Sequence, residues 1–240
     1  MQSSGGGNFF CTMKNKFTII LPSKGRLRQN SLNIFKKKKL KILSDKGERD
    51  LMGYVDSKKF RIQVIFLHAR ESIEALANGT ADICVSGIDL LKDSDPSIQK
   101  KIKIYKTLNF GHADLYICSP IQFLDLQSML DVSEIASDFI KYKKQPLKIG
   151  TKYKRLVEKF LIEKNVKNVE IVESKGATEA MPRLSQASLI GEIVSSGKTL
   201  VANDLRPLKK DGLILKSSAA CMVAKKSLNK KGIKKILSLF

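Results

Sequence analysis

The sequence predicts a protein of the α/β class, and two of its patterns lead to that prediction. Short runs of apolar and β-branched residues alternate along the chain with segments of helical periodicity. The clearest helical segment spans 153–163 and places on one face Tyr153, Leu156, Val157, Phe160 and Leu161, with lysines and glutamates opposite. Strands separated by helices are typical of parallel sheets, which we therefore expect here.

The first half of the chain follows this alternation closely. It opens with the apolar run FTIIL at 17–21, which we interpret as a buried strand, and a helix is expected from Leu27 to Leu40. The run FRIQVIFL at 60–67 predicts a second strand. An amphipathic stretch from Glu71 to Ala77 predicts the next helix.

The second half continues in the same way. Apolar and β-branched runs predict strands at 81–87, 113–119, 147–151 and 169–174, with the helix at 153–163 between the last two. A crossover strand is expected near 212–224. After it the chain carries one amphipathic run, which predicts a final helix at 231–240.

Four loops that follow predicted strands combine small residues, hydroxyls and lysines. They are 21–26 (LPSKGR), 86–89 (SGID), 150–153 (GTKY) and 174–179 (SKGATE). In α/β folds ligands bind where loops leave the carboxyl ends of strands, near helix N-termini that attract anions. Four such loops in register with the strand pattern therefore predict a phosphate-binding protein.

Composition limits the possible partners. The net charge of +21 suggests a polyanion, but only eight of the basic residues are arginine, and no arginine cluster or interleaved aromatic pattern occurs. We expect no specific nucleic-acid binding, and an acidic protein partner explains the charge equally well. No apolar run approaches the roughly 18 residues that a membrane helix needs, so we expect no membrane association.

The chain start and the cysteines are equally informative. Residues 1–12 resemble a flexible leader, Met13 is an alternative start, and no secretory apolar run is present, so we expect a cytoplasmic protein. The four cysteines show no metal-site spacing, and Cys84 and Cys118 lie in apolar runs where cysteine is a small core residue.

The segment 191–200 (GEIVSSGKTL) is rich in phosphate-binding chemistry. It is not a Walker A loop, because the first glycine would have to stand at Glu192. Backbone N–H groups from Ser195 to Thr199, with Gly197 allowing close approach, can instead surround one terminal phosphate. With Glu192 available for ribose hydroxyls or Mg²⁺, the pattern is typical of a phosphoribosyl pyrophosphate site. An ordinary polar turn between a helix and a strand is the alternative interpretation of this segment alone.

Five motifs in order resemble those of the ATP phosphoribosyltransferase family, over residues 17–226. They are LPSKGRL (21–27), GTADICVSGIDL (79–90), TKY (151–153), VESKGATEAMP (172–182) and EIVSSGKTLVANDL (192–205). The residues of these motifs are most similar to those of the short forms, in which the catalytic chain works with a separate regulatory subunit.

The resemblance implies a two-lobed type II periplasmic-binding-protein-like fold with the active site in the cleft between the lobes. It implies a first lobe of residues 13–108 plus 206–240 and a second lobe of residues 109–205. About 16 residues follow the crossover strand, too few for a C-terminal regulatory domain. Feedback control is then expected from a histidyl-tRNA-synthetase-like regulatory subunit, assembled with the catalytic chain as a hetero-octamer.

The implied reaction joins phosphoribosyl pyrophosphate to N1 of the adenine of ATP and releases pyrophosphate, the first step of histidine biosynthesis. The resemblance makes Arg26 and Arg49 the catalytic residues. It makes the substrate-binding residues Lys24, Gly25, Gly87, Thr151, Lys152, Glu179, Glu192, Ser195, Ser196, Gly197, Lys198 and Thr199. Mg²⁺ is expected as cofactor, carried by the substrates and near Glu192, with no protein ligand assigned with certainty.

Three positions depart from the family pattern. Ser188 and Glu192 stand where the family usually has a D-x-x-x-D pair, so one carboxylate is lost, and Lys198 replaces a small or neutral residue. Glu71 stands in place of an aspartate. The rival function is a two-lobed protein that binds a small anion without catalysis, against which the missing secretory leader and the SSGKT segment both argue.

Overall fold

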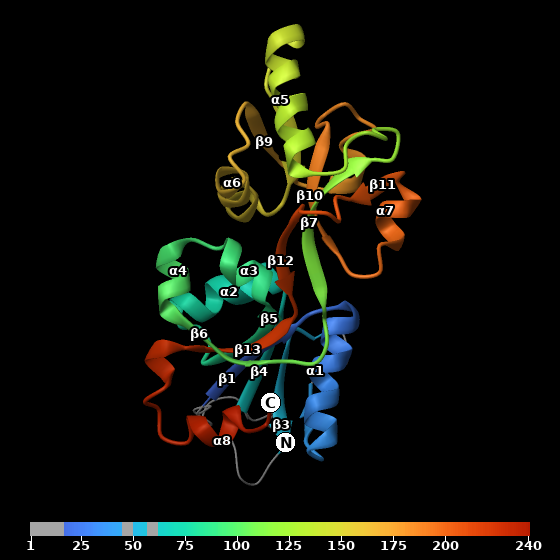
Figure 1. Cartoon of the computed structure of the whole chain (residues 1–240). Helices are drawn as coiled ribbons and strands as arrows, with labels where there is room; N and C mark the ends of the chain where they lie inside the picture. The colour runs from blue at the N-terminus through green and yellow to red at the C-terminus, as the bar shows by residue number, and fades with distance from the viewer. Residues whose placement is uncertain (1–16, 45–49, 57–61) are drawn as a thin grey trace, which may run out of the picture.

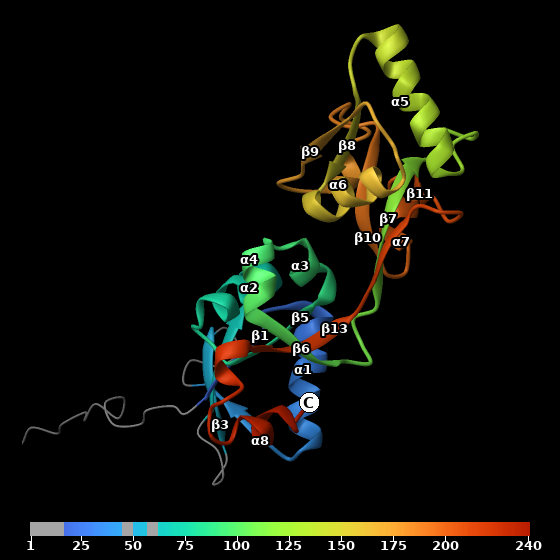
Figure 2. The ribbon, with the colours of Figure 1, turned by 60° about the vertical axis from the view of Figure 1, so that its left-hand side comes forward.

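The computed structural model describes residues 17–44, 50–56 and 62–240, which form two lobes joined by two strands (Figure 1). The predicted leader at 1–12, the alternative start Met13 and the predicted catalytic Arg49 lie outside the described residues. Each lobe is built on its own β-sheet with helices packed against it, as Figure 2 shows from a second direction.

The first lobe contains, among the described residues, a seven-stranded sheet of order β2-β3-β4-β1-β5-β13-β6. Its strands are β1 (Phe17–Pro22), β2 (Lys41–Leu43), β3 (Met52–Asp56), β4 (Ile62–Leu67), β5 (Ile83–Gly87), β6 (Ile102–Thr107) and β13 (Ala219–Ala224). Its helices are α1 (Gly25–Lys37), α2 (Ala69–Asn78), α3 (Ile88–Asp93), α4 (Pro96–Lys101), the 3-10 turn η3 (Lys225–Ser227) and α8 (Ile233–Leu237).

The second lobe contains, in the described part of the chain, a six-stranded sheet in which β11-β7-β10-β8-β9 are neighbours and β12 also pairs with β7. Its strands are β7 (Ala113–Pro120), β8 (Leu147–Thr151), β9 (Val169–Glu173), β10 (Leu189–Val194), β11 (Leu205–Pro207) and β12 (Leu213–Ser217). Its helices are α5 (Met129–Lys143), α6 (Lys154–Glu163), the 3-10 turn η2 (Thr178–Ala180) and α7 (Lys198–Ala202).

The apolar runs predicted as strands form the cores. Strand β13 is buried along its whole length, and Ile19, Ile20 and Leu21 of β1 are fully buried. Helix α6 buries Val157, Phe160 and Leu161 on its sheet-facing side, as its periodicity predicts. Cys84 and Cys118 are fully buried, which confirms that they are core residues.

Both sheets are mixed, so the prediction of parallel sheets was only partly right. Parallel pairs join β1 to β4 and β5, and β8 to β9 and β10, whereas β13 runs antiparallel to β5 and β6. The antiparallel pairs of β13 arise because the chain leaves the first lobe and returns to it, whereas β2, β3 and β4 form antiparallel pairs within the first lobe. A strand that arrives from the other lobe enters the sheet in the direction opposite to the strands that begin in it.

The return to the first lobe occurs later than the predicted boundary at residue 206. Strands β11 and β12 both pair with β7 in the second sheet, so the chain crosses back only between Ser217 and Ala219. The outward crossing lies between Thr107 and Ala113, close to the predicted position. Strands β7 and β12 pair side by side where the lobes meet (Figure 1).

The two lobes present the carboxyl ends of their parallel strands to each other. Helix α3 follows β5 in the first lobe and contacts α6, which follows β8 in the second lobe. Strand β1 is parallel to β5, and β10 is parallel to β8, so the loops after β1 and β10 leave from these same two edges. The fold therefore directs the predicted ligand loops toward the interlobe region.

Candidate active site

A small hollow in the second lobe gathers half of the predicted substrate-binding residues. Its volume is about 50 Å³, and it is lined by Glu179, Glu192, Ile193, Val194, Ser195, Ser196, Gly197, Thr199 and Leu200. We call residues 195–199 the phosphate loop. Lys198 belongs to this loop, but its side chain is exposed and does not line the hollow.

The backbone of Gly197 shapes the phosphate loop. Its φ of 73° lies in the left-handed region, and it is the residue that precedes helix α7. A Cβ placed at this position would have Val194 Cγ1 at 4.0 Å as its nearest described neighbour, so the space above the glycine is open. Glycine is thus favoured here by the turn, and it leaves room for a ligand to approach the backbone. The loop connects a strand to a short helix, unlike the polar turn between helix and strand considered above.

Glu192 is half-buried and lines the hollow. Its Oε1 accepts a hydrogen bond of 2.9 Å from the N–H of Ile193, whereas its Oε2 is buried without a hydrogen-bond partner among the described residues. Burial raises the pKa of the Glu192 carboxyl and the nearby Glu179 carboxylate adds to that rise, whereas the Ile193 N–H, the Thr178 hydroxyl and Lys152 oppose it. An oriented, unpaired oxygen of this kind suits a ligand hydroxyl or a cation.

Thr151 joins three of the predicted loops through its own contacts. Its buried hydroxyl donates to the Gly191 carbonyl at 2.7 Å and accepts from the N–H of Tyr153 at 2.9 Å. Its carbonyl accepts from the N–H of Ser174 at 2.9 Å. Thr151 therefore holds the loops together, because its hydroxyl already forms hydrogen bonds within the protein.

The loop after β1 presents a cationic helix end. Lys24, Gly25 and Arg26 are exposed at the N-terminus of α1, and within the described chain no side chain caps this end. Gly25 has a φ of 73° and open space where a Cβ would stand. The uncapped N–H groups and the two cationic side chains together favour an anion.

Arg28 is a residue of this loop region that sequence reasoning missed. It donates to the Ser23 carbonyl at 3.2 Å, and its guanidinium lies 4.6 Å from the centre of the Phe66 ring. Arg28 thereby holds the turn that carries Lys24 and Arg26. Its position two residues after Arg26, directly after the 21–27 motif, was the signal that could have found it.

Gly87 allows a close contact at the junction of the lobes. A Cβ on Gly87 would lie 2.3 Å from Oδ1 of Asp89, and this same oxygen accepts a hydrogen bond of 2.6 Å from the hydroxyl of Ser217. The absence of a side chain at Gly87 is therefore required for Asp89 to connect α3 to the end of β12. The structure supplies this packing reason for the glycine, next to its predicted substrate-binding role.

The predicted residues fall into two groups on opposite lobes. Among the described residues, only second-lobe residues line the hollow, and Lys152 lies close enough to Glu192 to influence its pKa. Lys24, Gly25 and Arg26 belong to the first lobe and do not line the hollow. A single site that uses both groups thus depends on how the lobes are held together.

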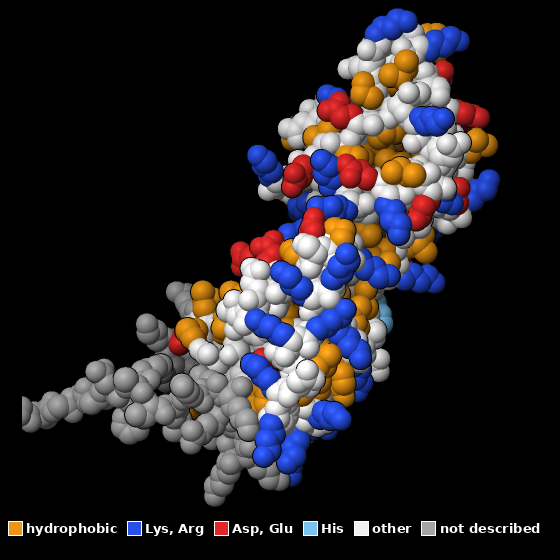
Figure 3. All heavy atoms as spheres, turned by 90° about the vertical axis from the view of Figure 1, so that its left-hand side faces the viewer, with side chains coloured by type: hydrophobic (Ala, Val, Ile, Leu, Met, Phe, Trp, Pro, Cys, Tyr) orange, Lys and Arg blue, Asp and Glu red, His pale blue; other side chains and the backbone are white. Residues whose placement is uncertain are grey.

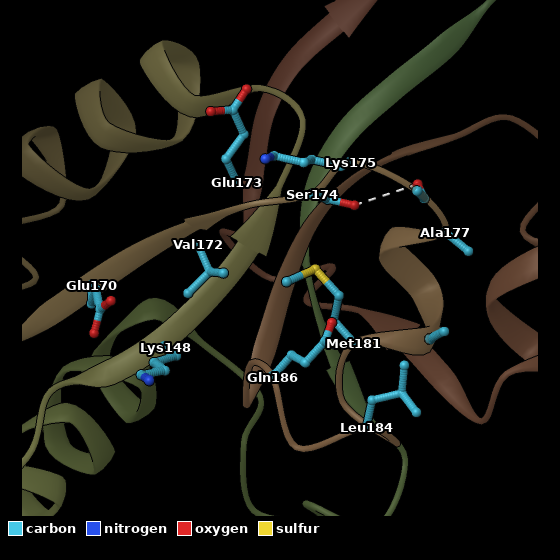
Figure 4. A pocket seen from close by; sticks show the side chains of 12 residues that line it. Lys148, Glu170, Val172, Glu173, Ser174, Lys175, Ala177, Met181, Leu184 and Gln186 are labelled. Atoms are coloured by element: carbon cyan, nitrogen blue, oxygen red, sulfur yellow. Dashed lines mark hydrogen bonds between the residues drawn. The ribbon is translucent and has the colours of Figure 1, made fainter.

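A larger pocket of about 630 Å³ lies on the other side of the 174–181 turn (Figure 4). The pocket was not predicted. It is lined by Lys148, Glu170, Val172, Glu173, Ser174, Lys175, Gly176, Ala177, Ala180, Met181, Leu184 and Gln186. In Figure 4, Val172 and the thioether of Met181 point toward each other across it. Because it does not include the phosphate loop or Glu192, the smaller hollow remains the candidate site despite its size.

The positive charge is distributed over the surface. Figure 3 shows lysine and arginine side chains scattered over the first-lobe face that contains α4 and β6. Exposed lysines there are Lys92, Lys100, Lys101, Lys103 and Lys106. Lysines on the edge strand β6 also discourage pairing with other strands. Over the described ranges, no helix is long and apolar enough to cross a membrane, and no group of three or more His, Cys, Asp or Glu side chains is arranged to hold a metal ion.

Comparison with known proteins identifies relatives of this chain. The family model described as ATP phosphoribosyltransferase matches residues 68–240. An ATP phosphoribosyltransferase of Rhizobium etli (strain CIAT 652) is 38% identical over 210 residues, covering 87% of this chain and 90% of the relative.

Solved structures show the same fold at low sequence identity. The ATP phosphoribosyl transferase (HisG:HisZ) complex from Thermotoga maritima is similar with a TM-score of 0.67 and 19% identity, over 92% of this chain and 94% of that one. A putative L-cystine ABC transporter protein from Listeria monocytogenes has a TM-score of 0.56 and 11% identity, over 92% and 86% of the two chains. The predicted two-lobed type II periplasmic-binding-protein-like fold is thereby confirmed.

Proposed function

Given that this chain belongs to the ATP phosphoribosyltransferase family, which carries out the first step of histidine biosynthesis, we propose that its two lobes divide the two substrates between them. The second lobe holds phosphoribosyl pyrophosphate at the phosphate loop. The first lobe brings the cationic end of α1 to the reacting phosphates.

One observation above all supports the donor site: within the described chain Oε2 of Glu192 is buried without a hydrogen-bond partner, and Glu192 lines the same hollow as the open turn at Gly197. The ribose hydroxyls of the donor supply the missing hydrogen-bond donors to Glu192. The terminal phosphate of the donor accepts hydrogen bonds from N–H groups of the phosphate loop and from the hydroxyls of Ser195, Ser196 and Thr199. Lys198 lies in the same loop and adds positive charge at its exposed side.

A Mg²⁺ ion fits the same hollow. Mg²⁺ is usually bound by one or two carboxylates together with substrate phosphates, and Glu179 and Glu192 both line the hollow. The ion would neutralise charge on the diphosphate group when bound. Ser188 therefore need not be replaced by a carboxylate for the ion to be held, because the substrate supplies the remaining oxygen ligands.

The residues of the chain act mainly by position and charge. Adenine N1 attacks C1 of the donor with inversion, the N1–C1 bond forms, and the C1–O bond breaks so that its electron pair leaves with pyrophosphate. The transition state separates a cationic sugar from a highly anionic leaving group, so preorganised cations lower its energy. Lys24, Arg26 and Lys152 supply these cations. Arg49, outside the described residues, is predicted to join them.

The family relationship also suggests a partner. The Thermotoga maritima structure is named as a HisG:HisZ complex, and the sequence motifs resemble the short forms. We infer that this chain assembles with a histidyl-tRNA-synthetase-like regulatory subunit, as a hetero-octamer by resemblance. Millimolar histidine should inhibit the assembled enzyme and leave the isolated chain active, and cooperative inhibition of the isolated chain would exclude this regulation.

Release of pyrophosphate from ATP and phosphoribosyl pyrophosphate tests the proposed site. Glu192→Gln should lower the affinity for the donor by about tenfold or more, because removing a charged hydrogen-bond partner costs about 1.5–3 kcal/mol. Glu163→Gln makes the same chemical change on an exposed side chain of α6 and serves as the matched control.

Donor affinity that is the same in both variants would contradict the assignment of Glu192. Tight donor binding by the wild-type chain without pyrophosphate release would instead favour the rival function, an anion-binding protein without catalysis.

A further inference from the structure

Helix α3 of the first lobe contacts both α6 and β12 of the second lobe, an ion pair joins Asp95 to Arg155, and the start of α2 reaches the segment before α6. Asp93 is the last residue of α3, Arg70 lies in the first turn of α2, and both belong to the first lobe. The segment 152–156 of the second lobe lies against them. We call Arg70 and Asp93 the interlobe clamp.

Asp93 completes a helix that begins in the other lobe. Helix α6 starts after Tyr153, which within the described chain provides no side-chain hydrogen bond to its first turn. Oδ1 of Asp93 accepts a hydrogen bond of 3.2 Å from the N–H of Leu156 in that turn, although the two residues are 63 positions apart. A carboxylate in this position satisfies an N–H left unpaired at the helix start and interacts favourably with the helix dipole. The cap of α6 is therefore supplied across the lobe boundary.

Arg70 ties this cap to the substrate loop. One nitrogen of its guanidinium donates to Asp93 Oδ2 at 3.2 Å, and the other donates to the carbonyl of Lys152 at 2.9 Å. The guanidinium also lies 5.9 Å from the centre of the Tyr153 ring. A planar fork of this kind holds two acceptors in a fixed relation, which a lysine cannot do.

The environment of Asp93 indicates that the interlobe clamp does more than stabilise the folded protein. Its side chain is only 4% exposed. Burial raises the pKa of the Asp93 carboxyl, and the Leu156 N–H and Arg70 only partly offset that effect. Burying a charge in this way is a poor route to stability, because its desolvation offsets much of the pairing energy. The Asp93 carboxylate does fix the position of α6 relative to Arg70, since each of its two oxygens accepts a directional hydrogen bond.

We propose that Arg70 and Asp93 are positioning residues that set the angle between the lobes and hold the Thr151–Tyr153 turn in place for the reaction. The turn connects directly to the donor site, because Thr151 bonds to the carbonyl of Gly191 beside Glu192. The effect of the clamp on catalysis rests on the proposed function. Its effect on the angle between the lobes does not depend on that function.

The lobe geometry can be measured without substrates by spin-label distances. Labels at Lys37→Cys on α1 and Lys143→Cys on α5 report on the two lobes, since both positions are exposed. The native Cys84, Cys118 and Cys221 are buried and should stay unlabelled, and Cys11→Ser removes the remaining thiol. We expect a single narrow distance distribution for the parent chain and a broader or shifted one after Arg70→Ala or Asp93→Asn.

Kinetics supply the second readout. Arg70→Ala and Asp93→Asn should each lower kcat by about tenfold or more, because each removes charge-assisted hydrogen bonds. The donor Kd should change less than kcat does, since the hollow itself is lined by residues of one lobe. Arg70→Lys should recover only part of the activity. Lys159→Ala is the control, because it breaks an exposed ion pair with Glu163 inside α6 that does not cross between lobes.

An unchanged distance distribution in Arg70→Ala and Asp93→Asn would overturn the inference, whatever happens to activity. A changed distribution with kcat equal to that of Lys159→Ala would overturn the link to catalysis. Failure of the proposed donor site has a different signature, because Glu192→Gln would then keep its donor affinity while the distance measurements remain interpretable.

Discussion

Replacing Gly197 by alanine tests whether the phosphate loop binds the donor through its backbone. At a φ of 73°, an alanine is strained by about 1–2 kcal/mol. In a chain of this length that strain lowers Tm by about 2–8 °C. The added methyl has no described neighbour closer than 4.0 Å, so it should not disturb the fold further. It does occupy the space through which a phosphate would approach the N–H groups.

The expected loss of affinity follows from those N–H groups. Each hydrogen bond from the backbone to a charged phosphate contributes about 1.5–3 kcal/mol, so losing one weakens donor binding about tenfold to hundredfold. Gly197→Val, with its branched side chain, should abolish donor binding. Titration calorimetry with phosphoribosyl pyrophosphate measures the loss, and thermal unfolding measures the strain.

Gly232→Ala provides the matched control. Gly232 also has a positive φ, of 93°, and precedes α8 in the first lobe. A Cβ there would lie 3.5 Å from the Phe17 ring, an ordinary contact. Gly232→Ala should therefore lower Tm by a similar amount and leave donor affinity unchanged. Equal donor affinity in the two alanine variants would refute the backbone-binding argument.

Three further predictions concern charge. Arg26→Ala should reduce kcat by a factor equivalent to about 2–4 kcal/mol while weakening substrate binding less, because its charge acts as pyrophosphate departs; unchanged turnover in single-turnover experiments would remove Arg26 from the mechanism. Burial raises the pKa of Glu192 above its ordinary value of 4.5, so the folded protein binds more protons than the unfolded one and loses stability as pH rises through that window. Glu192→Gln should therefore be more stable than the parent at neutral pH and no different below pH 4.5, and denaturation curves that show a constant gap at all pH values would contradict this. The net charge of +21 should give only weak nucleic-acid binding that falls steeply with salt, and sequence-specific binding at physiological ionic strength would show an additional function.

Local patterns in the sequence predicted the parts of the site that are local in the chain. Gly197 and Glu192 belong to one strand–turn–helix segment, so the motif and its spacing are enough to place both in one hollow. Helix α5 was also encoded locally, by a capping box in which the Ser128 hydroxyl and the Asp131 carboxylate each bond the other's backbone N–H. That signal was present in the sequence and was overlooked.

Contacts between distant segments could not be predicted in this way. Asp93 and Leu156 are separated by 63 positions, and nothing in the sequence around either residue indicates that a helix in one lobe is capped from the other. The membership of β12 in the second sheet was missed for the same reason, since pairing with β7 depends on the path of the chain between lobes. Contacts between distant segments depend on tertiary packing, which the periodicity of apolar residues does not predict.

The way the chain crosses between the lobes also constrains the order in which they can be completed during synthesis. The second lobe is one continuous stretch, from Ala113 to Ser217, whereas the sheet of the first lobe needs β13, which lies between β5 and β6 and follows that stretch. The ribosome synthesises the chain from its N-terminus. In the described part of the chain β6 pairs with β13, so β6 cannot form this pair until the whole second lobe has been made. The first lobe to begin is therefore the last to close, and the strand that closes it carries Ala219, the residue that pairs with Gly87 at the junction of the lobes.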